Sequence, residues 1–135
     1  MTVKILIVDD SKAMRMIVTR TLRQAGFGDH EFVEAENGAE GLAKTLAEAP
    51  DLVLSDWNMP EMTGIEFLQA LRAQGNEVKF GFVTSESTDA MRGLASDSGA
   101  LFLIAKPFTA DTFADALGGV LVGAPGPVHI SIWKV

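Results

Sequence analysis

The chain has 135 residues, of which 47% are hydrophobic and 21% are charged, and its formal net charge is −7. This length and composition predict one globular domain and argue against disorder. The apolar runs are too short to span a bilayer, and the absence of cysteine excludes disulfides and thiolate ligands. An acidic chain disfavours nucleic-acid binding, and no signal-peptide pattern opens the sequence, so we expect a cytoplasmic protein without membrane contact.

Five short apolar segments predict strands, and a helical pattern follows each of them. The strands are expected at residues 3–8, 32–35, 52–54, 78–83 and 101–105. The helices are expected at residues 13–25, 38–49, 64–74, 89–97 and 110–121. The apolar pattern of the first helix includes Ile17, and the second helix is expected to direct Leu42, Leu46 and Ala49 inward.

Alternating strands and helices favour a doubly wound α/β fold with a parallel sheet covered on both faces. In such sheets the ligand site lies outside the carboxyl ends of the strands. The chemically capable residues stand at these ends: Asp9, Asp10, Asp56, Thr84 and Lys106. Single residues of these types also serve as helix caps, but capping does not explain the lysine.

Carboxylates brought together at this edge indicate a cation site. Two of them about 4 Å apart repel by about 4 kcal/mol at an effective dielectric constant near 20, and a divalent cation removes that cost. A site with oxygen ligands alone suits Mg²⁺ or Mn²⁺. No phosphate-binding loop of the P-loop type is present, which argues against ATP as a direct phosphoryl donor.

Four separated motifs occur in a recognisable order. They are Asp-Asp after the first strand, Asp-Trp-Asn-Met-Pro-x-Met-x-Gly after the third, Thr-Ser after the fourth and Lys-Pro-Phe-Thr after the fifth. From about residue 3 to 122 the chain resembles a receiver domain of the two-component response regulators, the family that includes the chemotaxis regulator CheY. The resemblance implies a CheY-like, flavodoxin-like sheet of order 2-1-3-4-5 flanked by five helices, and a receiver domain at residues 1–122.

The resemblance also implies a role for each site residue. Asp56 would accept a phosphoryl group from a phosphohistidine on a sensor histidine kinase or phosphotransfer protein. The metal ligands would be Asp9, Asp10, Asp56 and the backbone carbonyl of Asn58. The chain would be a signalling protein rather than an enzyme, acting through an unknown downstream protein target.

The same resemblance assigns the residues around the phosphoryl group. Lys106 and the Thr84 hydroxyl would contact its oxygens, and Asn58 and Glu86 would tune its lifetime. The chain departs from many receivers at Leu103, where an aromatic switch residue is usual, and Phe102 would point to the opposite face of its strand. We therefore expect the signal to leave through the loop after Thr84 and the weakly helical residues 89–97.

The end of the chain is the second departure. Residues 123–127 are rich in proline and glycine, and Val128, Ile130 and Ile132 then alternate with polar residues. This pattern favours an extra strand that pairs with a sheet edge, in a monomer or a tail-mediated homodimer. The alternative is a linker or a disordered end.

Two other functions remain open at this stage. A haloacid-dehalogenase-type phosphohydrolase combines similar groups, but that family places its nucleophile in an Asp-x-Asp motif after the first strand, where this chain has Asp9-Asp10-Ser11. The second alternative is a scaffold that binds partners without being phosphorylated. The presence of Asp56, Thr84 and Lys106 together argues against it.

Overall fold

Five parallel strands form one sheet, in the order β2-β1-β3-β4-β5, in a computed structural model that describes residues 3–121. The strands are β1 (Lys4–Val8), β2 (Glu31–Ala35), β3 (Leu52–Ser55), β4 (Lys79–Thr84) and β5 (Phe102–Ala105). The predicted fold class and strand order are confirmed. The strand expected near the C-terminus lies outside the described residues.

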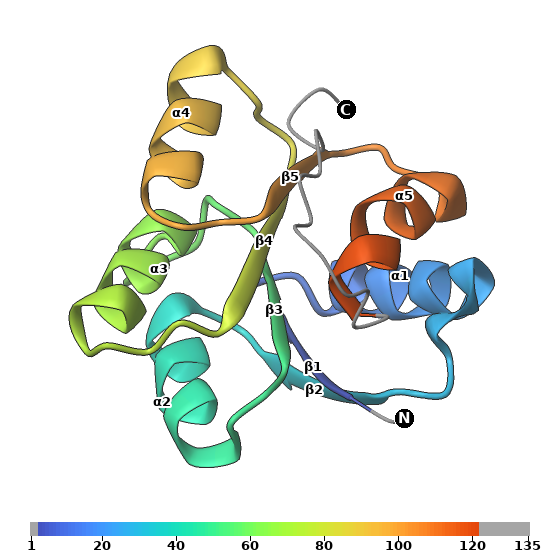
Figure 1. Ribbon diagram of the computed structural model, residues 1–135, viewed down its shortest axis with the longest axis horizontal. Helices are drawn as coiled ribbons and strands as arrows, with labels where there is room; N and C mark the ends of the chain where they lie inside the picture. Colours follow the sequence, from blue (N-terminus) through green and yellow to red (C-terminus); the bar gives the residue numbers. More distant parts are fainter. Residues whose placement is uncertain (1–2, 122–135) are drawn as a thin grey trace.

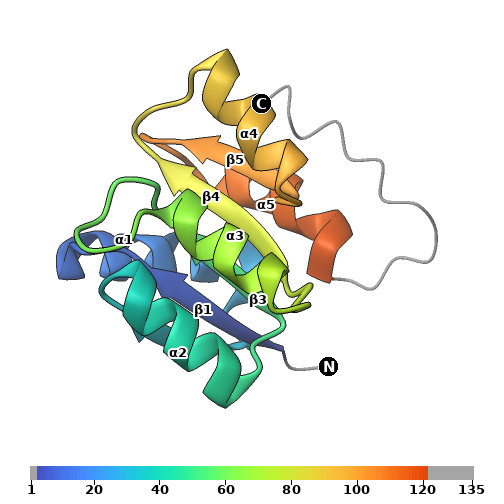
Figure 2. The same ribbon diagram turned by 90° about the vertical axis from the view of Figure 1, so that its left-hand side faces the viewer.

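Helices cover both faces of this sheet. They are α1 (Lys12–Leu22), α2 (Gly38–Glu48), α3 (Gly64–Ala73), α4 (Asp89–Asp97) and α5 (Ala110–Leu121), and α1 continues into one π-helical turn at Arg23–Phe27. Figure 1 shows α1 and α5 on one face and α2, α3 and α4 on the other, and Figure 2 shows the same layers from the side. Within residues 3–121, no helix combines the length and the apolar character that a membrane span requires.

Side-chain caps fix where the helices begin. Ser11, Asn37, Thr63 and Thr88 each accept a hydrogen bond from the backbone N–H three residues further along the chain, at the starts of α1, α2, α3 and α4. At α3 the cap is reciprocal, because Glu66 also accepts from the backbone of Thr63. These caps satisfy backbone N–H groups in the first turns of α1 to α4.

The hydrophobic core consists of two clusters, one on each face of the sheet. Phe67, Phe80 and Phe82 are fully buried in the cluster under α2, α3 and α4, and Phe102 and Phe113 in the cluster under α1 and α5. Leu103 belongs to the first cluster while its neighbour Phe102 belongs to the second. The prediction that these two residues face opposite sides of β5 is thus confirmed.

Two apolar side chains that were expected to face inward are exposed instead. Leu46 of α2 is 51% exposed and Ile17 of α1 is 42% exposed. In α2 the buried residues are Gly38, Gly41 and Thr45, while Leu42 is partly buried against the core as expected. A Cβ on Gly41 would lie 3.1 Å from the ring of Phe67. The helix approaches the core through small side chains, which turns Leu46 outward.

The other corrections concern Ile17 and the end of α2. In α1 the buried residues are Val18, Thr21 and Leu22, and Ile17 lies one position, about 100°, around the helix from Val18. The second helix ends at Glu48, so Ala49 is not part of it. Ala49 adopts a left-handed conformation with φ of 47°, directly before Pro50. The helical spacing of apolar residues identified the apolar faces of α1 and α2. It overestimated how many residues of each face are buried against the sheet.

Gly64 lets α3 begin directly against the end of β3. Its backbone N–H donates to the carbonyl of Trp57 at 2.8 Å. A Cβ at this position would lie only 2.1 Å from the carbonyl oxygen of Asp56. Any larger residue must therefore displace the loop that carries Asp56.

Replacing Gly64 with alanine should lower the free energy of unfolding by about 1–3 kcal/mol, as overpacking does in a close-packed site. Gly93→Ala is the matched control, because Gly93 is exposed within α4 and a Cβ there meets nothing within 4 Å. That control should raise stability by about 0.5–1 kcal/mol through helix propensity. Urea denaturation of both variants measures the difference, and equal midpoints would contradict the proposed contact.

Candidate functional site

The register of the sheet places the ends of β1 and β3 side by side. Val8 pairs with Ser55, so the residues that follow them, Asp9 and Asp56, emerge at the same level. The backbone N–H of Asp56 donates to the carbonyl of Val8 at 2.9 Å, which extends the pairing by one step. Two carboxylates from residues 47 positions apart in sequence thus meet at one edge.

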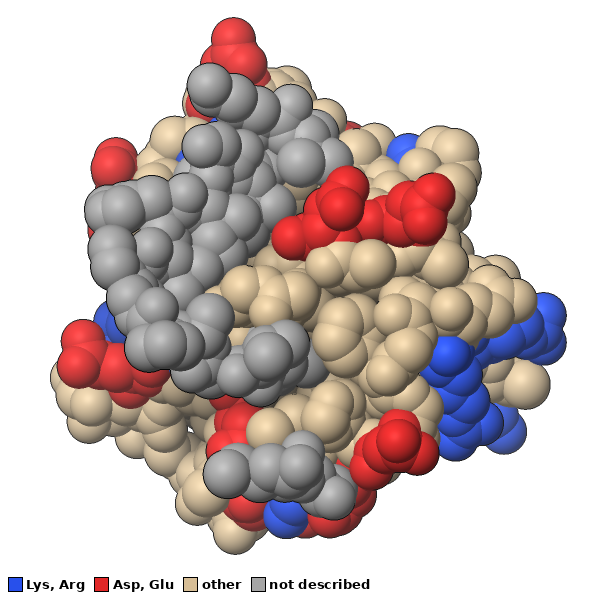
Figure 3. Space-filling view, turned by 45° about the vertical axis from the view of Figure 1, so that its right-hand side comes forward, with Lys and Arg blue, Asp and Glu red and all other residues tan. Residues whose placement is uncertain are grey.

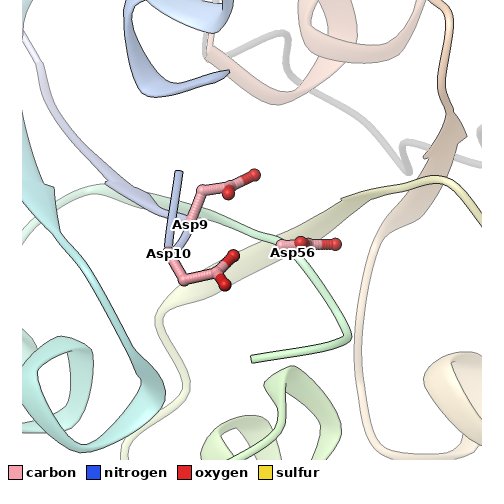
Figure 4. A group of neighbouring side chains, drawn as sticks. All are labelled: Asp9, Asp10 and Asp56. Atoms are coloured by element: carbon pink, nitrogen blue, oxygen red, sulfur yellow. The ribbon is translucent and has the colours of Figure 1, made fainter. Parts of the chain in front are cut away.

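Asp10 completes a group of three carboxylates. One oxygen from each of Asp9, Asp10 and Asp56 lies within 4.8 Å of the others. Figure 4 shows these side chains gathered at the ends of two strands. Asp9 is 4% and Asp56 9% exposed, whereas Asp10 is exposed. The group is therefore partly shielded from water and still reachable from one side.

Lys106 brings a single positive charge to this group. Its Nζ lies 3.2 Å from Oδ2 of Asp9 and 3.6 Å from Oδ2 of Asp56. Its backbone N–H donates to the carbonyl of Thr84 at 2.8 Å, so the ends of β4 and β5 are also in step. Thr84 is fully buried. The five residues predicted at the strand ends lie together at one edge of the sheet.

The protein environment changes the pKa of Asp56. Burial raises this pKa above its ordinary value, and the neighbouring charge of Asp9 raises it further. Lys106, the backbone N–H of Trp57 and the Thr84 side chain act in the opposite direction. Because burial is the largest of these effects, the environment disfavours the charged form of the Asp56 carboxyl, and a bound cation would counteract this rise in its pKa.

The carboxylates fit a hard divalent cation by their chemistry. Three negative charges face one ammonium group, which leaves the group with excess negative charge, and every candidate ligand is oxygen. The described residues that line the group supply no imidazole, and the chain has no thiolate. This donor set favours Mg²⁺ or Mn²⁺ over Zn²⁺.

Asn58 and Glu86 lie at the rim of the site and contact each other. The amide nitrogen Nδ2 of Asn58 donates to Oε1 of Glu86 at 2.9 Å, which links the loop after β3 to the loop after β4. Both residues are exposed. Both residues were predicted for the site from the sequence, but the hydrogen bond between them was not.

Arg15 is a functional candidate that sequence reasoning missed. Its Nη1 donates to the carbonyl oxygen of Asp9 at 2.6 Å, and its Nε lies 2.7 Å from Oε1 of Glu34 in β2. The arginine side chain is only 11% exposed. It fastens α1 to the end of β1 and so holds the acidic loop. Its position one turn into α1, close to the acidic loop, could have indicated this role. The helical pattern instead assigned Arg15 to a polar face of the helix.

Trp57 contacts Asp56 through its backbone N–H, a contact that cannot be predicted from the type of the residue. Its N–H donates to Oδ1 of Asp56 at 2.7 Å. The residue is 8% exposed, and its ring packs against that of Phe82 with the ring centroids 4.8 Å apart. The loop after β3 is therefore anchored in the core on one side of Asp56, and the hydrogen bond limits the rotation of the carboxylate.

A doubly wound sheet with three carboxylates, a threonine and a lysine at the ends of β1, β3, β4 and β5 defines a receiver-type phosphoacceptor domain. The family model described as "Response regulator receiver domain" matches residues 5–118. The chain belongs to this family of two-component signalling proteins.

Relatives and solved structures agree with this assignment. The chain is 39% identical to the Rhizobium etli protein "Probable chemotaxis protein CheY" and 39% identical to chemotaxis protein CheY1 of Helicobacter pylori strain J99. Each alignment covers 87% of this chain and 92% or 96% of the relative. The structure of Vibrio cholerae CheY4 has a TM-score of 0.78 at 36% identity and covers 90% of this chain and 100% of that one. The chain is thus similar to CheY-type receivers over nearly their whole length.

Proposed function

We propose that Asp56 is the phosphoacceptor of this receiver domain and that a phosphohistidine on a partner protein is its donor. The observation that carries the proposal is the position of Asp56, whose carboxylate contacts Lys106 and belongs to one group with the carboxylates of Asp9 and Asp10. Of the three carboxylates, it is the one that follows β3, the central strand of the sheet.

The transfer requires little covalent chemistry from the protein. A carboxylate oxygen of Asp56 forms a bond to phosphorus while the phosphorus–nitrogen bond of the donor breaks, and the donor imidazole keeps the electron pair and takes up a proton. Charge on the phosphoryl oxygens must be balanced, and Lys106 and the Thr84 hydroxyl stand beside Asp56 for this role. The Trp57 N–H holds the carboxylate in place.

Asp9, Asp10 and Asp56, with the backbone carbonyl of Asn58, are the residues that would hold Mg²⁺. The bound cation would supply positive charge to the acidic group and to the incoming phosphoryl oxygens. Asp10 is the exposed member of the group. We assign it to the metal alone.

The proposal is tested with acetyl phosphate and Mg²⁺, followed by intact mass and peptide mapping of the acyl phosphate. The parent protein should gain one phosphoryl group on Asp56, and Asp56→Asn should gain none. Removal of Mg²⁺ with a chelator, or Asp10→Asn, should slow incorporation by at least about tenfold, as expected when ligand charge is lost from a cation site. Asp97→Asn, an exposed carboxylate on α4, is the control and should behave like the parent.

Two outcomes would overturn the assignment of Asp56. A phosphoryl group trapped on Asp9 instead of Asp56 would support the haloacid-dehalogenase-type chemistry. Complete failure of the parent to incorporate phosphate, from either acetyl phosphate or a phosphohistidine protein, would support a scaffold that binds without being phosphorylated.

We further propose that Asn58 and Glu86 set how long the phosphoryl group survives. Their hydrogen bond bridges two loops at the exposed rim of the site, where a hydrolytic water must enter. Loss of either side chain opens that path. Neither side chain is among the carboxylates that we assign to the cation, so metal affinity should change less than the decay rate.

Asn58→Ala and Glu86→Ala should each speed dephosphorylation by about two- to tenfold, the range of a hydrogen bond worth about 0.5–1.5 kcal/mol. The double variant should decay no faster than the singles, because each substitution already breaks the shared bond. Glu61→Ala is the control, since Glu61 lies on the same loop but accepts from Asn37 instead. Decay measured after removal of the donor gives the rates, and fully additive effects would contradict the coupling.

We propose that Thr84 and Leu103 form the switch and that α4 transmits the signal. Leu103 is fully buried and pairs in register with Phe82, two residues before Thr84. Helix α4 follows the loop after Thr84, and Ala95 is its one buried residue. A helix held by so little buried surface opens at low cost in free energy.

Addition of beryllofluoride and Mg²⁺, which mimic the phosphoryl group, should change amide exchange in α4 by about tenfold, equivalent to about 1.4 kcal/mol. Helix α2 covers the same face of the sheet and serves as the internal control, with unchanged exchange. Exchange measured by NMR or mass spectrometry distinguishes the two helices. Unchanged rates in α4, or equal changes in both helices, would refute this route.

A further inference from the structure

Arg15 differs from the other basic residues of its helix. Residues 12–27 hold four Lys or Arg side chains and no Asp or Glu. Figure 3 shows the side of the molecule that carries α1 and α5, where Lys and Arg gather at one margin of a largely uncharged surface. Lys12, Arg20 and Arg23 are exposed, whereas the Arg15 side chain is only 11% exposed. Because arginine is rarely buried unless it is paired, the contacts of Arg15 indicate its role.

The guanidinium of Arg15 joins α1 to the ends of two neighbouring strands. Its Nη1 donates to the backbone carbonyl of Asp9 at 2.6 Å, and its Nε donates to Oε1 of Glu34 at 2.7 Å. The next residue of β2, Ala35, accepts a hydrogen bond from the backbone N–H of Asp9 at 3.1 Å. The backbone of Asp9 is therefore held at both of its polar groups, by β2 at the N–H and by α1 at the carbonyl.

The carbonyl that Arg15 holds belongs to the peptide group that joins Asp9 to Asp10. The Asp9 carboxylate has contacts of its own, with the backbone N–H of Ser11 at 2.9 Å and with Nζ of Lys106 at 3.2 Å. Within the described part of the chain, no such contact fixes the side chain of Asp10. Because a peptide group is planar, the direction of the Asp9 carbonyl determines how the chain enters Asp10. The hydrogen bond from Arg15 thus orients two of the three carboxylates.

We propose that Arg15 is a positioning residue of the cation site and that its hydrogen bond to the Asp9 carbonyl sets the affinity of the acidic group for Mg²⁺. The inference rests on the cation site proposed above. Arg15 acts through the backbone of Asp9 and touches no carboxylate of the acidic group itself. Groups that hold the ligands of a metal in place commonly change its affinity by about 10- to 100-fold.

Glu34 offsets the charge of Arg15. A guanidinium without a counter-charge would repel a divalent cation at the acidic group, but Glu34 places a carboxylate oxygen 2.7 Å from Nε. A polar pocket of about 250 Å³, lined by Arg15 and Glu34 among other residues, opens at this pair, and the Glu34 side chain is 52% exposed. Salt therefore screens the charge of Glu34, whereas the hydrogen bond to Asp9 is shielded from solvent.

Arg15→Met gives opposite expectations for charge and for position. Methionine keeps an unbranched side chain but removes the positive charge and both hydrogen bonds. If the charge alone mattered, loss of a repelling group would tighten Mg²⁺ binding. Loss of positioning should weaken it by about tenfold relative to the parent, and this factor should persist at about 1 M salt. A Mg²⁺ titration followed by the amide NMR signals of Asp10 and Asp56 measures the affinity without any phosphoryl donor.

Glu34→Gln isolates the contribution of charge. The amide oxygen of glutamine still accepts a hydrogen bond from Nε of Arg15, but the negative charge is gone. Mg²⁺ binding should weaken by about two- to threefold at low salt. The difference from the parent should vanish at about 1 M salt, where the Debye length is about 3 Å.

Two control variants of the same helix complete the test. Val18→Ala lowers the free energy of unfolding, because Val18 is buried in the core beneath α1, but it should leave Mg²⁺ affinity unchanged. Arg20→Met removes an exposed charge that forms no ion pair within the described residues, and its affinity should match that of the parent.

Mg²⁺ binding by Arg15→Met that equals or exceeds that of the parent would overturn the inference while the cation site stands. An equal loss of affinity in Val18→Ala would also overturn it, because general loosening of the fold would then explain the effect. Absence of Mg²⁺ binding in the parent would overturn the cation site itself and the inference with it.

Discussion

The crowding of Asp9, Asp10 and Asp56 against one lysine is the constraint on which the rest of the site depends. Each close pair of carboxylates costs about 4 kcal/mol at an effective dielectric constant near 20, and Lys106 offsets only part of that repulsion. The fold tolerates the excess because it ends two neighbouring parallel strands at the same level. Binding of a cation relieves the repulsion, so the fold itself creates the affinity for positive charge.

Contacts outside the acidic group hold this arrangement in place. Arg15 ties α1 to the carbonyl of Asp9, and Gly64 lets α3 start within contact distance of the carbonyl of Asp56. Trp57 packs into the core and directs its N–H at the carboxylate. These contacts act on backbone atoms next to the charged residues, which fixes the positions of the carboxylates without neutralising them.

The strands of the sheet and the five side chains at its edge could be predicted from the sequence. Each strand is a short apolar run, and the polar residue that follows the run marks the end of the strand. The burial of individual helical side chains could not be predicted in the same way, because it depends on which residues of other elements pack against the helix. Leu46 and Ile17 follow helical periodicity but are exposed, whereas Leu42 packs against the core and the buried residues of α2 are Gly38, Gly41 and Thr45. Arg15 escaped notice because a long side chain can reach back along its helix to a strand end, and residue spacing does not encode that reach.

On the face of the sheet covered by α2, α3 and α4, the aromatic side chains near the site lie on β4 and after β3 rather than on β5. Trp57 packs on Phe82 and Phe82 on Phe80, with ring centroids 4.8 and 5.1 Å apart, while the β5 position beside Phe82 holds Leu103. Trp57 directly follows Asp56 and donates its backbone N–H to the Asp56 carboxylate, and Phe82 lies two residues before Thr84. Asp56 and Thr84 are therefore each linked to this aromatic stack by a short stretch of backbone. Movement of Thr84 toward a phosphoryl group would pull the end of β4 and alter the packing between Phe82 and Leu103. In the switch that we propose, the core beneath α4 is therefore reached through β4, the strand that carries Thr84, rather than through a ring on β5.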